Sequence, residues 1–404
     1  MRHSIVLPAI AAAALLLLFA SSTPVALAQN ATRVVVPPSA IEHPGDAGVR
    51  AHTNIIYMLF DKSVAEDPNP PIGENPASLA CIYHLVKRTT GCPKTSTIVP
   101  NGGTKAIALV DAFDNPYAET DLKTFASAYG YGTPNFTKVK VGNPKQGQGW
   151  DVEESLDIEY AFGMAPHAHI YLVEANSNND VDLYAAEDKA TKLIQAEGGG
   201  QISNSWGEGE FSGENVNDKH FKGKGVVYFA SSGDSGGQVI YPSASPFVVS
   251  AGGTYIARNS SGDFVNEAGW SDAGGGPSQF ESRPSYQNII KSIVGTHRGT
   301  PDFSSEASNV SYVVIYNQYT CHGWCGVGGT SVSSPTLAGI VNAGGKFNTS
   351  TAAENGEAYK DYANGTTYKA DWNDVTVGSN SRYACKKGWE FCTGIGSPKT
   401  YKGK

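Results

Sequence analysis

The sequence predicts an α/β fold, a doubly wound and mostly parallel sheet with helices on both faces. Short apolar runs with the length of buried strands recur along the chain, such as KAIALVDA at 105–112 and GVVYFAS at 225–231. Segments with the apolar spacing of helices lie between these runs, as expected for crossovers between parallel strands. In such a sheet, we expect a functional site beyond the carboxyl ends of the strands.

The first expected strand, 105–112, ends near Asp111, and a helix over 118–129 follows Asn115-Pro116. A helix over 152–164 should stop at Ala165-Pro166, because the residue before a proline disfavours helical backbone angles. The other expected elements are strands over 169–175, 201–205 and 225–231, a short apolar run at 246–252, and a helix over 331–344 after a glycine-rich turn.

The composition limits the functional classes. With 404 residues, of which 40% are hydrophobic, the chain can build one large core or two modest domains. Only 17% of the residues are charged, below the roughly 25% of ordinary soluble proteins, so few ion pairs are lost when acid protonates carboxylates. The net charge is −8 and no basic cluster is present, which argues against a nucleic-acid partner.

The N-terminus has the pattern of a secretory signal peptide over residues 1–28. Arg2 and His3 precede an apolar run at 9–20, and Ala26-Leu27-Ala28 fits the cleavage rule. A membrane anchor, the alternative, would need a longer apolar span. We therefore expect a secreted protein with no membrane contact after signal removal, a flexible arm over 29–50 and one domain over 51–404.

Six cysteines remain in the exported chain, and export favours disulfides over metal thiolates. Six cysteines allow 15 connectivities, of which we predict the three local pairs. These pairs are Cys81–Cys92, Cys321–Cys325 and Cys385–Cys392.

The strongest chemical motif is GGTSVSSP at 328–335, which places Ser331 after a glycine turn and at the start of a helix. A serine in this position is an exposed nucleophile near the positive end of the helix dipole. Taken alone, the pattern is more typical of a serine that caps a helix. The same Gly-Thr-Ser pattern occurs in subtilisins, but none of the nine histidines of this chain lies in the histidine motif that those enzymes use as base.

A carboxylate pair supplies a base. The segment 151–159 holds five acidic residues, and Glu153 and Asp157 are four residues apart, on one helix face. In a partly buried cleft the two would share a proton, and such a pair still works in acid, where histidine is protonated. A solvated acidic first turn is the alternative, and it accounts well for Asp151 and Glu154.

A third motif, SSGDSGG at 231–237, places Asp234 in a glycine-rich loop after a strand. A protonated carboxyl group there could donate a hydrogen bond to a developing oxyanion. Alone, the pattern is better explained by an Asx turn.

Together these motifs resemble the sedolisin family, the serine-carboxyl peptidases with a subtilisin-like fold. The resemblance extends over about residues 50–400. The further segments that carry it are 107–122, Ser203 to Gly207, Trp270-Ser271 with Gly274 to Gly276, Pro284 and Gln287, and Gly299 to Ser304.

The resemblance implies a role for each matching residue. Ser331 would attack the scissile carbonyl, Glu153 would take its proton, Asp157 would orient Glu153, and Asp234 would donate to the oxyanion. Ser205, Trp206 and Gly207 would bind the substrate, and Trp206 would help to link the carboxylate network.

The chain departs from the family pattern in two places. The family has a large folded pro-domain, for which the segment 29–50 is too short. The family also binds calcium near its C-terminus. In this chain the matching oxygens would come from Asp374, Val375, Lys386, Gly388 and Glu390, but two lysines crowd the loop and a disulfide could replace the ion partly or wholly.

We therefore predict a secreted, monomeric, acid-acting endopeptidase that cleaves protein or peptide substrates through an acyl-enzyme. Two alternatives remain open: a tripeptide-releasing exopeptidase of the same family, and a catalytically silent peptide-binding homologue. A metal-dependent hydrolase is a further alternative, but the carboxylate cluster lacks histidine ligands at matching spacing.

Overall fold

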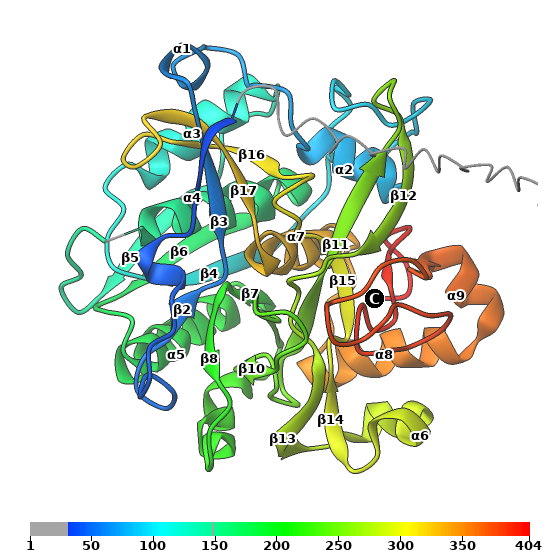
Figure 1. The fold of residues 1–404 in the computed structure, drawn as a ribbon. Helices are drawn as coiled ribbons and strands as arrows, with labels where there is room; N and C mark the ends of the chain where they lie inside the picture. Colours follow the sequence, from blue (N-terminus) through cyan, green and yellow to red (C-terminus); the bar gives the residue numbers. More distant parts are fainter. Residues whose placement is uncertain (1–30, 148) are drawn as a thin grey trace, which may run out of the picture.

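The computed structural model describes residues 31–147 and 149–404. Its centre is an eight-stranded sheet (Figure 1) in the order β12-β11-β9-β7-β4-β6-β5, with β15 paired to β11. The ladder from β5 to β11 and β15 is parallel, and β12 pairs antiparallel with β11. The predicted class, α/β with a mostly parallel sheet, is confirmed. The strand bounds are β4 Ala106–Ala112, β5 Phe136–Val141, β6 His169–Ala175, β7 Gly200–Asn204, β9 Val226–Ser231, β11 Val249–Arg258, β12 Phe264–Gly269 and β15 Phe303–Glu306.

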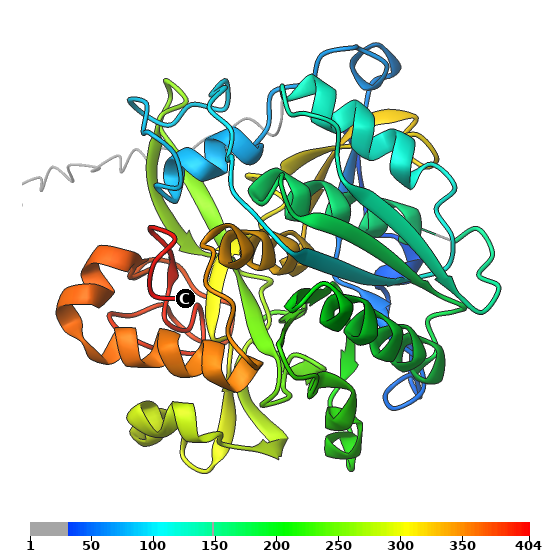
Figure 2. The ribbon, with the colours of Figure 1, turned by 180° about the vertical axis from the view of Figure 1, so that it is seen from behind.

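Helices cover both faces of this sheet because its strands are apolar on both faces. In β4, Ile107 and Leu109 join the core under α3 (Ala118–Ala128), α4 (Trp150–Met164) and α7 (Thr330–Ala343). Ala108 and Val110 of the same strand join the core under α5 (Asp180–Ala196). Figure 2 shows α4 and α5 on opposite sides of the strands β4 and β6.

The predicted elements are present with small shifts of their ends. The helix expected over 152–164 begins two residues earlier, at Trp150. Only the second part of the apolar run expected at 246–252 is in β11, which begins at Val249. The strand continues to Arg258 because β12 folds back on it and β15 pairs with its other side.

The expectation of a flexible arm over residues 29–50 is wrong for the described part, from Ala31 on. Residues Ala31–Val35 form β1, which pairs with β3 (Ile56–Phe60) in a second, antiparallel sheet. The order of this sheet is β1-β3-β17-β16, where β17 is Gly323–Gly328 and β16 is Val313–Asn317. The signal peptide expected over 1–28 lies outside the described residues.

The three predicted disulfides are confirmed. Each bridge joins cysteines close in sequence: Cys81 to Cys92, Cys321 to Cys325, and Cys385 to Cys392. The second bridge ties the end of the loop before β17 to that strand, which leads directly into α7 and Ser331.

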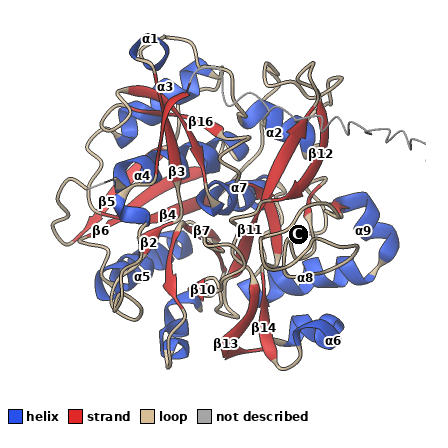
Figure 3. Ribbon diagram, in the orientation of Figure 1, coloured by secondary structure: helices blue, strands red, loops and turns tan. Residues whose placement is uncertain are grey.

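Shorter elements complete the fold. The C-terminal helices gather beside β11 and β15, at the opposite side of the molecule from β5 (Figure 1, Figure 3). No helix in the described part of the chain is long and apolar enough to cross a membrane. The remaining helices are α1 Lys62–Ala65, α2 Pro76–Ile82, α6 Lys291–Val294, α8 Thr351–Ala363 and α9 Gly365–Asp371, and the remaining strands are β2 His52–Thr53, β8 Trp206–Gly209, β10 Ile240–Tyr241, β13 Gly276–Ser282, β14 His297–Thr300, β18 Trp372–Asn373 and β19 Ser397–Pro398.

Candidate active site

Ser331 lies at the start of α7, directly after the turn that follows β17. Gly329 makes this turn possible, because its φ of 125° lies in the region that favours glycine. A Cβ at this position would stand 2.0 Å from the carbonyl oxygen of Asn54 and 2.7 Å from Oδ2 of Asp234. The turn before Ser331 therefore packs closely against the segments that contain Asn54 and Asp234.

The Ser331 hydroxyl group contacts the first predicted carboxylate. Its Oγ lies 3.0 Å from Oε2 of Glu153 and donates to it. The carbonyl oxygen of Ser205 lies 3.1 Å from the same Oγ. The nucleophile and a base are thus within hydrogen-bond reach, the first geometric requirement for proton transfer.

Helix α4 carries both members of the carboxylate pair. Every residue of this helix is buried, so its acidic side chains have no access to solvent. Oδ1 of Asp157 accepts a hydrogen bond from Oγ of Ser205 at 2.7 Å. Within the described residues, Oε1 of Glu153 and Oδ2 of Asp157 have no hydrogen-bond partner, so each can carry or receive a proton.

Burial sets the protonation of the pair. It raises the pKa of Glu153 well above its usual value, and the negative charges of Asp157 and Asp111 raise it further, against the hydrogen bond from Ser331. Burial, followed by the charge of Asp111, also raises the pKa of Asp157 well above its usual value. Ionisation of both carboxyl groups in such a site has a high free-energy cost, so the two groups share one proton.

Asp234, in the loop after β9, contacts Thr330, the residue directly before Ser331. Its Oδ1 accepts hydrogen bonds from the backbone N and from Oγ1 of Thr330, both at 2.8 Å. Burial raises its pKa to about 8, although the two bonds from Thr330 oppose the shift. Below that pH the group is neutral, and Oδ2, which has no partner among the described residues, can carry the proton as a donor.

The predicted substrate-binding residues lie where β7 passes into β8. Ser205 contacts both Asp157 and Ser331, and Gly207 lies on β8. The expectation that Trp206 links the carboxylates is wrong in this structure. Its indole Nε1 donates to the carbonyl oxygen of Val110 at 2.9 Å, because the ring packs in the core beneath α5.

A further buried carboxylate was not predicted as part of the site. Asp111, near the carboxyl end of β4, is fully buried, and burial followed by the charge of Glu174 raises its pKa to about 8. Its charge contributes to the raised pKa of both Glu153 and Asp157. The signal was present in the sequence, since Asp111 stands near the end of an apolar strand, where such a sheet places its site.

The interpretation of Asp151 and Glu154 as members of a solvated helix turn is wrong, because both side chains are fully buried. Burial, and then the charge of Glu174, raises the pKa of Glu154 well above its usual value. Glu174 is the register partner of Asp111, and its Oε1 lies 3.2 Å from Nζ of Lys138. A second group of carboxylates, Asp111, Glu154 and Glu174, therefore lies beside Glu153 and Asp157.

These raised pKa values predict that the folded chain loses stability as the pH rises. Burial raises the pKa of Asp111 from 3.8 to about 8 and that of Glu174 from 4.5 to about 7, so the native state holds protons that the unfolded state has released. The contribution of these groups to the free energy of unfolding is therefore complete below about pH 4. It decreases as the pH rises and is lost by about pH 8. We expect the thermal midpoint of the Ser331→Ala protein to be at least ~5 °C lower at pH 8 than at pH 4.5. A midpoint that rises over this interval would contradict the protonation of these buried carboxyl groups.

The residues predicted to hold calcium are arranged differently from a cation site. The two carboxylate oxygens of Asp374 accept from the backbone N of Gly388, at 3.0 and 3.2 Å. The carboxylate oxygens of Glu390 accept hydrogen bonds from the backbone N of Cys392 and from the backbone N and Oγ1 of Thr393. Three side chains of metal-ligand type converge in this loop, Cys385, Glu390 and Cys392, but the two sulfurs form a disulfide. Because the carboxylates face N–H donors, these residues do not fit a calcium ion.

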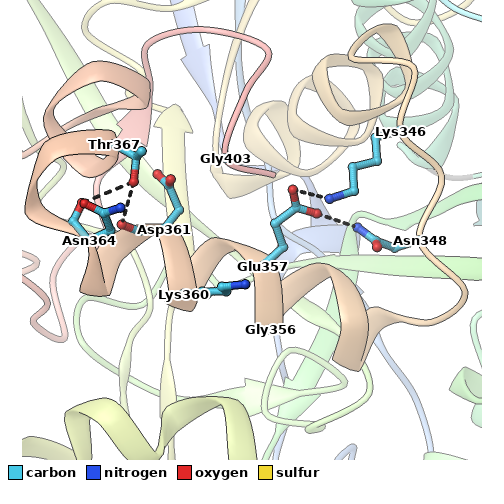
Figure 4. Close-up of a pocket in the computed structure, with 9 residues that line it drawn as sticks. All are labelled: Lys346, Asn348, Gly356, Glu357, Lys360, Asp361, Asn364, Thr367 and Gly403. Atoms are coloured by element: carbon cyan, nitrogen blue, oxygen red, sulfur yellow. Dashed lines mark hydrogen bonds and ion pairs between the residues drawn. The ribbon is translucent and has the colours of Figure 1, made fainter.

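A separate hollow lies along α8, next to the C-terminal segment (Figure 4). The Nζ of Lys346 forms an ion pair with Glu357, and Asn348 donates to the same side chain at 3.1 Å. None of the residues that line this hollow belongs to the catalytic group, so it is not part of the site.

The doubly wound sheet, with Ser331 at the start of α7 and paired carboxylates on α4, has the arrangement of a subtilisin-like fold. The Subtilase family matches residues 125–379. The chain is 25% identical to sedolisin of Pseudomonas sp., over 80% of this chain and 60% of that protein. It is 29% identical to kumamolisin of Bacillus sp., over 81% of this chain and 62% of that protein. The chain thus spans less than two thirds of the length of these relatives.

A solved structure of Pseudomonas sedolisin in complex with pseudo-iodotyrostatin has the same fold. It superposes with a TM-score of 0.66 at 24% identity, over 81% of this chain and 95% of that chain. The protein belongs to the subtilase family.

Proposed function

We propose that the protein is a secreted serine-carboxyl endopeptidase that hydrolyses protein substrates in acid. The observation that carries this proposal is the hydrogen bond of 3.0 Å from Oγ of Ser331 to Oε2 of Glu153. A buried carboxylate stands where a neutral-pH serine peptidase would have its histidine.

The chemistry is acyl transfer. Oγ of Ser331 attacks the scissile carbonyl carbon while its proton moves to Glu153, and the oxyanion receives hydrogen bonds from the backbone N of Ser331 and from the protonated Asp234. Glu153 then protonates the leaving amine. Water, deprotonated by Glu153, hydrolyses the acyl-enzyme and restores the serine. Asp157 holds Glu153 and shares its proton, and Ser205 fixes Asp157 through the bond of 2.7 Å.

The working pH follows from the same groups. The oxyanion donor Asp234 needs its proton, which it keeps below a pKa of about 8. The pair Glu153 and Asp157 needs one proton rather than none, and burial raises the pKa of both. Deprotonation at higher pH therefore removes the donor and the shared proton together, which supports an enzyme of acidic surroundings.

Two features support secretion. The signal pattern over residues 1–28 marks the chain for export, and all six cysteines are paired, as expected in an oxidising compartment.

The proposal includes a C-terminal loop held by the Cys385–Cys392 disulfide and by the hydrogen bonds of Asp374 and Glu390 in place of calcium. We expect a chelator such as EDTA to leave the thermal midpoint unchanged within ~1 °C, because no cation would be withdrawn. Differential scanning calorimetry with and without EDTA measures this. A fall of several degrees, reversed by added calcium, would sink this part of the proposal.

The function is tested with a denatured protein as substrate at about pH 4, where one carboxyl group of the pair is expected to be protonated. Mass spectrometry of the products should show internal cleavage into peptides of many lengths. Tripeptides released in order from the N-terminus would establish the exopeptidase instead, since relatives of this chain include a tripeptidyl-peptidase of Dictyostelium discoideum. No product at any pH, from a folded protein, would favour the silent homologue.

A further inference from the structure

The first turn of α4 carries Glu153 but begins without a capping side chain. Gly149, the residue before the helix, has a φ of 86° and no side chain that could accept from the first backbone N–H groups. Helix ends of this kind fray more readily than the interior of a helix. The bond of 3.0 Å between Glu153 and Ser331 therefore depends on other contacts that hold this turn.

Two asparagine side chains hold the turn from its flank. Nδ2 of Asn317 donates to the carbonyl oxygen of Asp151 and to Oγ of Ser155, both at 3.0 Å. Nδ2 of Asn115 donates to the same two oxygens, both at 3.2 Å. An amide NH₂ group has two donors, so both groups are fully used. The two acceptors stand two residues before and two residues after Glu153, so four hydrogen bonds bracket the base.

The opposite end of each amide fixes its orientation. Oδ1 of Asn317 accepts from the backbone N of Thr320 at 2.8 Å and from that of Cys321 at 3.1 Å. Oδ1 of Asn115 accepts from the backbone N of Tyr117 at 2.9 Å. Only the oxygen of an amide group can accept these bonds, so the NH₂ groups must face α4. Both side chains are fully buried, where water cannot replace a lost partner.

Asn115 connects the turn to the central sheet. It follows β4, and its backbone N donates to Oε1 of Glu174 on β6 at 3.0 Å. Its carbonyl oxygen accepts from Nζ of Lys138 on β5 at 2.7 Å. Three neighbouring strands of the sheet thus fix the residue that donates to the first turn of α4.

Asn317 connects the same turn to the strand that leads to the nucleophile. It is the last residue of β16 and the register partner of Gly323 on β17. The disulfide Cys321–Cys325 closes the loop between these strands, and β17 runs directly into the turn before Ser331. One amide therefore refers the base to the sheet, and the other refers it to the strand before the serine.

The two loops that carry these asparagines also contact each other near the surface. The rings of Tyr117 and Tyr319 stack with their centroids 6.4 Å apart and an angle of 22° between their planes. The backbone N of Gln318 donates to Oδ2 of Asp121 on α3 at 3.1 Å. A shift of either loop is thus resisted by the other, which favours a fixed position of both amides.

We propose that Asn115 and Asn317 are positioning residues that keep Glu153 within hydrogen-bond reach of Ser331. This inference rests on the proposed function. Neither asparagine touches the reacting atoms, so each acts through the first turn of α4. A displacement of about 1 Å in a reacting group can cost ~10²-fold in rate. The loss should appear in kcat and not in KM, because the amides do not contact the substrate-binding strand β8.

The first test compares Asn115→Ala, Asn317→Ala and the double variant in steady-state cleavage of a peptide at about pH 4. We expect each single variant to lower kcat about fivefold with KM unchanged. The double variant should lose ~10²-fold, more than the product of the single losses, because in each single variant the remaining amide still serves both acceptors. A double loss no larger than that product would overturn the inference.

The decisive test repeats Asn317→Ala in the Glu153→Gln background. If the asparagine acts through the base, kcat should fall by less than twofold once the base is gone. A fivefold loss in both backgrounds would overturn the inference and leave the proposed function standing. Wild-type activity of Glu153→Gln itself would overturn the proposed function instead. If Asn317→Ala did not fold, Asn115→Ala decides the question in the same two backgrounds.

Asn342→Ala is the matched control. Asn342 is also fully buried, and its Nδ2 donates to Oε1 of Gln201 at 2.8 Å. Its Oδ1 accepts from the backbone N of Thr104 at 3.0 Å, so its loss removes similar bonds away from α4. The thermal midpoint should fall as in Asn317→Ala, while kcat stays within twofold of the wild type. An equal loss of kcat in both variants would show that any buried asparagine has this effect, and would contradict the assigned positioning.

Discussion

Replacement of Ser331 by alanine is expected to abolish peptide-bond cleavage, with a loss of at least ~10⁴-fold in kcat/KM. The alanine removes the only atom that can form the acyl-enzyme, while the substrate cleft and the oxyanion donors stay in place. The measurement is cleavage of a denatured protein and of a quenched peptide at about pH 4, with circular dichroism to establish the fold.

Ser333→Ala is the matched control for this prediction. Ser333 lies on the same helix, is equally buried, and accepts hydrogen bonds from Ser305 rather than contacting the carboxylates. Its loss should lower stability by about 1 kcal/mol and leave kcat within a few-fold. Comparable activity of Ser331→Ala and Ser333→Ala would remove Ser331 from the chemistry.

Glu153→Gln should cost ~10²–10⁴-fold in kcat/KM, the usual contribution of a general base. The amide keeps the size of the side chain and a contact with Ser331, but it cannot accept the proton. KM should change little, because Glu153 acts on the reacting atoms and not on the substrate backbone. Steady-state kinetics at several pH values measure both parameters.

Glu159→Gln is the matched control for the loss of kcat/KM expected in Glu153→Gln. Glu159 is another fully buried carboxyl group of α4, but its Oε2 accepts from the backbone N of Tyr316, away from Ser331. If both variants retained wild-type activity, the assignment of the base would be wrong. If both lost activity equally, the effect would come from the helix and not from proton transfer.

The central sheet could be predicted from the sequence because its strands are buried on both faces. Runs such as Ile107 to Val110 are apolar at every position, and the helices between them end at clear signals such as Ala165-Pro166. The second sheet could not be predicted in this way. Its strands β1 and β17 lie far apart in the sequence, and they meet only through β3. Local sequence patterns carry no information on such a pairing.

The candidate site also has residues that the sequence predicts and residues that it does not. Ser331, Glu153, Asp157 and Asp234 stand in motifs with a recognisable chemistry, and the structure brings all four together. Asp111 was missed because a single aspartate at the end of a strand has many explanations until its neighbours are known.

The most direct test of the account is the pH dependence of kcat/KM for a peptide substrate, measured from pH 2 to 9 with the Ser331→Ala protein as blank. The account predicts a bell-shaped profile with its maximum in acid, which falls as the shared proton of Glu153 and Asp157 is lost. Glu153→Gln should lower the whole profile. An activity that instead rises through about pH 7 to a neutral or alkaline plateau, as a histidine base would produce, would contradict the proton transfer between Ser331 and Glu153.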